Sequence, residues 1–136
     1  MKLLTKIVFA SAVLASQMGH GGGCCSEESV FGPPTGTVCP TPTTTLTYNN
    51  FGKPFMEMYC TKCHASDKVG EARQGAPSFH DFDSYQGIKV VAEHIDETTG
   101  SGPNATNEGM PEDNPKPSLA ERQMLAEWIA CGMPEQ

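Results

Sequence analysis

Two cysteines and a histidine lie together in the segment Cys60-Thr61-Lys62-Cys63-His64. Two thiols separated by two residues and followed directly by an imidazole form the pattern that covalent haem attachment requires. The thiols would add to the two vinyl groups of a haem, and the imidazole of His64 would coordinate the iron. The segment therefore predicts one haem c, bound covalently through Cys60 and Cys63.

Two other kinds of site use the same residue types. A zinc ribbon needs a second C-x-x-C pair or a pair of spaced histidines, and the remaining cysteines provide neither. A thioredoxin-like redox pair follows a strand of an α/β unit, whereas this segment follows a stretch that contains proline and methionine. Haem attachment is therefore the favoured interpretation. The other cysteines are Cys24, Cys25, Cys39 and Cys131.

The first residues of the chain have the pattern of an export signal. Lys2 and Lys6 precede a short apolar run that ends near Ala15, which is typical of a signal peptide. The run is too short to cross a bilayer as a permanent helix. We expect residues 1–23 to be a signal peptide, and the mature protein to be in the periplasm or on the outer surface of a bacterial membrane. Covalent haem attachment in bacteria also takes place on the exported side.

The end of this signal is open to two interpretations. The sequence before Ser16 would suit an ordinary signal peptidase, whereas Gly22-Gly23-Cys24 is similar to the end of a lipoprotein signal. In the second case Cys24 would carry lipid, and the lipid would be the protein's contact with the membrane.

The mature chain is acidic. Removal of Lys2 and Lys6 leaves seven basic against sixteen acidic residues, a formal charge of −9. Such a surface is unsuited to nucleic acid and is repelled by acidic membranes. The expected partners are redox proteins, and we expect the protein itself to be a monomer.

Residues 24–47 are rich in proline and threonine and show no helical period, so they predict an extended tether before a domain at 48–136. Cys39 is the exception within the tether. Exported proteins rarely keep isolated free thiols, and Cys131 is the partner available in the domain. We predict a disulfide between Cys39 and Cys131, which would contribute about 4 kcal/mol in the chain-entropy picture.

Two helices are expected at the ends of the domain. The first lies within the stretch Tyr48–Tyr59, with Asn49 or Asn50 as its cap and Pro54 in its first turn. The last begins at the capping box Ser118-Leu119-Ala120-Glu121 and stops at Gly132 and Pro134. Its buried residues are expected to be Leu125, Trp128 and Ile129.

Another helix is predicted from Ser84 to Glu93 or Ile95, capped by Asp81 or Asp83. No stretch of comparable quality predicts a strand. We therefore expect an all-α fold, a small bundle of three to four helices around one haem.

Together these features resemble the class I cytochrome c family, over roughly Tyr48 to Pro134. Gly52 stands where the family uses a small residue so that the first and last helices can cross, and Trp128 takes the aromatic position on the last helix. Pro77 matches the proline whose carbonyl accepts a hydrogen bond from Nδ1 of the proximal histidine. The resemblance implies that this bond orients His64 and strengthens it as a ligand.

The sixth iron ligand is expected to be Met110. It lies between a glycine and a proline in a loop before the last helix, as the distal methionine of the resembled family does. Met56 and Met58 are too close to Cys60, and Met124 is expected in the core. The alternatives are Met133, His80 and His94, and the two histidines are otherwise expected on the surface.

These expectations combine into a function, electron transfer by one haem with His64 and Met110 as axial ligands. The protein would then be a carrier and not an enzyme. Two alternatives stay open: a haem enzyme or gas sensor with a displaceable sixth ligand, and a cytochrome subunit of a larger oxidoreductase.

Overall fold

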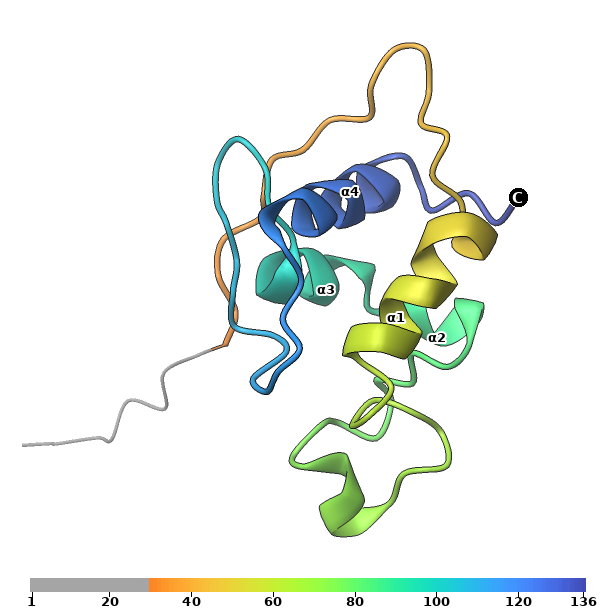
Figure 1. Cartoon of the computed structure of the whole chain (residues 1–136), viewed down its shortest axis with the longest axis vertical. Helices are drawn as coiled ribbons and strands as arrows, with labels where there is room; N and C mark the ends of the chain where they lie inside the picture. The colour runs from red at the N-terminus through yellow and green to blue at the C-terminus, as the bar shows by residue number, and fades with distance from the viewer. Residues whose placement is uncertain (1–29) are drawn as a thin grey trace, which may run out of the picture.

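The structure is a computed structural model that describes residues 30–136. The predicted signal peptide and Cys24 lie outside the described residues. Within residues 30–136 the structure is helical, without a strand and with one isolated β-bridge between Ser101 and Thr106 (Figure 1). The all-α class is confirmed at this level. The elements in order are η1 (Tyr48–Gly52, a π-helix), α1 (Lys53–Tyr59), η2 (Gly70–Arg73, a 3₁₀-helix), α2 (Tyr85–Val90), α3 (Ala92–Thr99) and α4 (Leu119–Ala130).

The N-cap of the first helical segment, η1 with α1, lies two residues before Asn49, the earlier of its two expected caps. Thr47 is the N-cap, and it forms a capping box with Asn50: Asn50 N donates to Thr47 Oγ1 at 3.2 Å, and Thr47 N donates to Asn50 Oδ1 at 2.7 Å. The expectation of Asn49 or Asn50 as the cap was wrong. Thr47 has the extended backbone of a cap, so Asn50 takes the third helical position.

Helix α4 has the predicted capping box, with Ser118 and Glu121 bonded reciprocally. It packs against η1 near its C-terminal end and lies beside the end of α1 near its N-terminal end. A Cβ added to Gly52 would lie 2.5 Å from the Trp128 ring, so only glycine permits this approach. At the other end, Tyr59 Oη donates to Glu121 Oε1 at 2.7 Å. The predicted close approach at Gly52 and Trp128 is present in the structure.

The predicted middle helix is two helices. α2 starts after Ser84, whose Oγ accepts from Gly87 N at 3.1 Å, so the cap is neither Asp81 nor Asp83. The helix breaks at Val91 and α3 continues to Thr99, beyond the expected end. Two adjacent β-branched residues, Val90 and Val91, weaken a helix locally, and Val91 is buried at this break.

One hydrophobic core joins these helices. Four of its side chains have no exposed surface: Met56 from α1, Ile88 from α2, and Leu125 and Trp128 from α4. Among residues 30–136, no helix combines the length and the apolar character that crossing a membrane requires.

The segment before η1 is extended, as predicted, but it is not a free tether. Thr35 is buried, and its backbone N and its Oγ1 donate to the Asp96 carboxylate at 2.9 and 2.8 Å. Gly32 N donates to Glu97 O at 2.7 Å. The expectation of an unpacked tether was therefore wrong for this part of residues 30–47. α3 supplies acceptors that the composition of the segment does not reveal.

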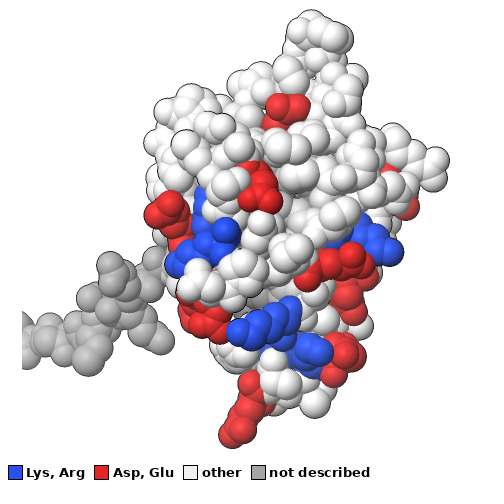
Figure 2. All heavy atoms as spheres, viewed as in Figure 1, with Lys and Arg blue, Asp and Glu red and all other residues white. Residues whose placement is uncertain are grey.

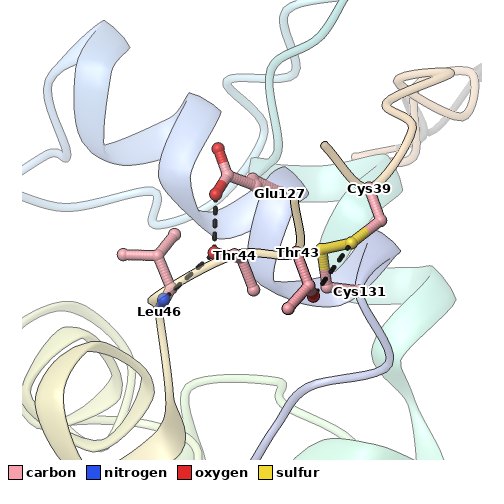
Figure 3. The surroundings of a disulfide bond; sticks show 6 residues. All are labelled: Cys39, Thr43, Thr44, Leu46, Glu127 and Cys131. Carbon is pink, nitrogen blue, oxygen red and sulfur yellow. Dashed lines mark hydrogen bonds between the residues drawn. A yellow bond between two sulfur atoms is a disulfide. The ribbon is translucent and has the colours of Figure 1, made fainter. Parts of the chain in front are cut away.

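The predicted disulfide between Cys39 and Cys131 is present, with a Cα–Cα distance of 4.7 Å (Figure 3). It joins the N-terminal segment to the residue that caps α4. Beside it, Thr44 Oγ1 donates to Glu127 Oε1 at 2.6 Å.

Replacing both cysteines, as Cys39→Ser with Cys131→Ser, is expected to lower the unfolding temperature by about 10 °C or more. The bond closes a loop over a sequence separation of 92, worth about 4 kcal/mol in the chain-entropy picture. Thermal unfolding followed by circular dichroism measures this. The matched control is Thr44→Ala, which leaves the disulfide in place and removes the two neighbouring hydrogen bonds, to Glu127 Oε1 and from Leu46 N, at a cost of about 1 kcal/mol each. Equal melting of the double variant and the wild type would contradict the prediction.

Candidate functional site

The segment Cys60 to His64 continues α1 as a helical turn. Cys60 N donates to Met56 O at 2.9 Å, and His64 N donates to Cys60 O at 2.9 Å. In a helical turn, residues separated by three and four positions lie on the same face. Cys60, Cys63 and His64 have this spacing, and all three line one cavity. The end of α1 therefore delivers the two thiols and the imidazole to one place.

This cavity has a volume of about 370 Å³, within the range of sites that hold small organic ligands. Its wall also contains the two other predicted site residues, Pro77 and Met110. Residues far apart in the sequence thus meet at one hollow, with His64 from the turn after α1 and Met110 from the loop after α3. The cavity also has apolar walls, from residues that include Phe82 and Ile95.

The two thiols are not joined to each other in a disulfide. Burial raises the pKa of the Cys60 thiol to about 12, and the charge of Cys63 adds to this. Cys60 is therefore protonated near neutral pH. The active thiol of a thioredoxin-like pair has a lowered pKa instead, so the electrostatics argue against that use of the segment.

His64 is buried against two other rings, those of Phe82 and His80. Its imidazole stacks on Phe82 with centroids 4.6 Å apart and planes 10° apart. Burial lowers the pKa of His64, and the nearby His80 lowers it further. The ring is thus favoured in its neutral form, which is the form that coordinates a metal. Nδ1 is buried and has no hydrogen-bond partner among the described residues.

The expected bond from His64 Nδ1 to the Pro77 carbonyl is not formed in this structure. That carbonyl accepts from Arg73 Nη2 at 2.5 Å and from His80 N at 3.0 Å. The cause is Arg73, a buried side chain whose guanidinium also donates to Ala65 O and the Asp81 carboxylate. A guanidinium carries five N–H donors, so it can organise the loop after His64. Sequence reasoning missed Arg73 because its acceptors are mostly backbone carbonyls.

Met110 is half-buried in the wall of the cavity. Its backbone is held on both sides: Met110 N donates to Thr98 O at 2.9 Å, and Met110 O accepts from Arg122 Nη1 at 3.1 Å. Gly109, the preceding residue, packs on the N-terminal segment, since a Cβ there would lie 2.3 Å from Val30 O.

The other methionines are placed differently. Met56 and Met133 belong to the hydrophobic core and do not line the cavity. Met58 borders the cavity from its exposed position before Cys60. Met124 is 37% exposed, so the expectation that it lies in the core was wrong.

The two rival histidines also border the cavity. His80, expected on the surface, is buried, and its Nε2 lies 3.4 Å from Nδ1 of His94. Burial lowers the pKa of His80, and His94 adds to the effect. His94 is exposed as predicted, and its ring meets Phe31 edge to face with centroids 5.1 Å apart. Phe31 also lines the cavity, although it belongs to the segment that was predicted to be a tether.

The mouth of the cavity is bridged by an exposed ion pair. Lys62 Nζ lies 2.6 Å from Asp113 Oδ2. The hydrogen bond from Lys62 lowers the pKa of the Asp113 carboxyl. The pair connects the turn after α1 with the Met110 loop, although exposed pairs of this kind contribute little stability.

Within residues 30–136, no three His, Cys, Asp or Glu side chains are grouped closely enough to hold a metal ion by themselves. A haem iron takes its in-plane ligands from the porphyrin and needs only axial ligands from the protein. Two thiols, a neutral imidazole and a thioether around an apolar cavity have the chemistry that covalent haem needs. The described residues leave the buried Nδ1 of His64 without a hydrogen-bond partner, as a ring whose bonds form only with the group in place would be.

Comparisons with protein-family models, with curated proteins and with solved structures gave no match to this chain.

Proposed function

We propose that this protein is an exported mono-haem cytochrome of the c type that carries single electrons between redox partners. The observation that supports this most is that Cys60, Cys63, His64 and Met110 all line one cavity. Residues of this kind at this spacing, around a hollow with apolar walls, suit a covalently held haem. The resemblance to the class I cytochrome c family supports the same proposal.

A haem in this site would supply reversible one-electron exchange at iron. Cys60 and Cys63 would hold it through thioethers, and His64 and Met110 would be the axial ligands. A soft thioether ligand favours Fe(II), and an apolar pocket disfavours the extra charge of Fe(III). Phe82 and Ile95 would exclude water from the pocket. No residue is required as acid, base or nucleophile, so the proposal is a carrier and not an enzyme.

The path for electrons would be the edge of the site near Cys60 and Cys63, which are both half-buried. Acidic and basic side chains are intermingled on the face seen in Figure 2. Together with the net acidic charge of the chain, this suits a partner that carries complementary basic groups. If residues 1–23 act as the predicted signal peptide, this exchange would take place outside the cytoplasm.

A redox titration with visible spectra of the matured protein tests this function. We expect one covalent haem per chain, a low-spin spectrum with the weak charge-transfer band of methionine-bound Fe(III), and a single one-electron transition. Slow binding of CO to the reduced form would agree with a permanent sixth ligand. Protein matured in a host that attaches haem, yet free of haem, would overturn the proposal. Rapid CO binding would favour the gas sensor or haem enzyme instead.

A further inference from the structure

Arg122 is a buried arginine on α4 with an unusual set of partners. Its side chain is 2% exposed. Nη1 donates to three backbone carbonyls, Thr99 O at 2.9 Å, Asn107 O at 2.7 Å and Met110 O at 3.1 Å. In the described part of the chain, no carboxylate lies within ion-pair distance of it. Arg122 is thus a buried cation compensated by carbonyl dipoles.

The three carbonyls belong to the elements that place Met110. Thr99 is the last residue of α3, and Asn107 and Met110 lie in the following loop, which runs beside α3 and α4 (Figure 1). Residues 102–117 contain no helix or strand that could hold them through regular backbone bonds. The Arg122 guanidinium bonds this loop to α4, beside the bonds from Asn107 N to Gly100 O and from Met110 N to Thr98 O that hold it to the end of α3.

Burial of an unpaired guanidinium is costly unless its donors are satisfied. Desolvation lowers the pKa of Arg122, although an arginine stays charged at neutral pH. Nη1 has two N–H groups for three carbonyls, so at least one N–H is shared. A core position on α4 could be filled by an apolar side chain at lower cost, which points to a role beyond packing.

We infer that Arg122 is the positioning residue for Met110, and that its buried charge favours the reduced state of the site. This inference rests on the proposed function. The guanidinium fixes the Met110 backbone, and the backbone fixes the reach of the thioether toward an iron held by His64. A positive charge that is bonded to the ligand residue and has no carboxylate within ion-pair distance disfavours the additional charge of Fe(III).

Three substitutions separate the two effects. Arg122→Lys keeps the charge but loses the planar fork, Arg122→Gln keeps a donor but loses the charge, and Arg122→Met loses both. The matched control is Leu125→Ala, a fully buried position on the same helix. It weakens the core without being bonded to the Met110 loop.

In Arg122→Met we expect loss of the methionine charge-transfer band and at least tenfold faster CO binding to the reduced protein. Arg122→Gln should retain much of the band but reduce the equilibrium constant for reduction about tenfold, which is 59 mV for one electron. Arg122→Lys should keep the potential near that of the wild type with a weakened band. Leu125→Ala should melt earlier with an unchanged band and CO rate.

Amide hydrogen exchange across residues 102–117 gives a readout that does not use the haem. It should become faster in Arg122→Met and remain unchanged in Leu125→Ala, after correction for global stability. If Arg122→Met does not fold, Arg122→Gln carries the test through its potential and its exchange rates.

The inference fails if the Arg122 variants keep the wild-type band, CO rate and potential, or if Leu125→Ala loses the band to the same extent. The proposed function fails separately, if the wild type itself holds no covalent haem. Combining Arg122→Gln with Met110→Ala should add nothing to the CO rate of Met110→Ala, because Arg122 acts on that rate through Met110.

Discussion

The double variant Cys60→Ser with Cys63→Ser is expected to lose all covalently attached haem. A hydroxyl does not form the thioether that a thiol forms with a vinyl group, and both sulfurs line the same cavity. The mass of the denatured chain should therefore fall to that of the polypeptide alone. Haem staining of denaturing gels should be negative. Each single variant should retain at most one thioether link.

The chain contains its own matched control for this experiment. Cys39 and Cys131 are also a cysteine pair, but they form the disulfide at the far end of α4. Replacing them should lower stability and leave covalent haem in place. Covalent haem in the Cys60 and Cys63 double variant, or its loss only when the disulfide is removed, would contradict the assignment.

Loss of these links should also destabilise the domain. Much of the wall of the cavity is apolar, and its residues, Phe82 and Ile95 among them, would lack a partner of matching shape. A domain of this size has a small protein core, so the cofactor would supply a large share of the buried contacts. We expect a lower unfolding temperature in the double variant, measured by circular dichroism beside the wild type.

The second large effect is expected for Met110→Ala. Removal of the thioether should abolish the methionine charge-transfer band, open the iron to fast CO binding, and lower the midpoint potential by about 0.1 V or more. Axial ligands shift haem potentials over a range of about 0.8 V, and methionine raises the potential. Visible spectra, CO mixing kinetics and redox titration measure the three changes.

Met58→Ala is the control, because Met58 also borders the cavity but lies exposed before Cys60. It should leave the band and the potential unchanged. If the band persists in Met110→Ala, another methionine is the ligand. If the wild type has no such band, His80→Ala and His94→Ala decide between the histidines, since both line the same cavity.

Several features of this protein follow from the sequence alone because they depend on residues a few positions apart. The spacing of Cys60, Cys63 and His64 places them on one face of any helical turn, and the structure has that turn. The capping box of Ser118 and Glu121 begins α4 through hydrogen bonds between residues three positions apart. The close approach at Gly52 and the disulfide between Cys39 and Cys131 could also be predicted. Glycine allows two segments to approach closely, and the cysteines of exported proteins are usually paired.

Only the tertiary structure decided the remaining contacts, because their partners come from distant parts of the chain. His80 and Thr35 are polar residues whose burial depends on α3, which no local pattern shows. The Pro77 carbonyl bonds to Arg73 because the loop folds around that guanidinium. Arg122 occupies a core-facing position of α4 that composition would assign to an apolar side chain. A charged group can be buried there because it donates to three carbonyls, from the end of α3 and the loop that follows it. These carbonyls come together only when the chain is folded.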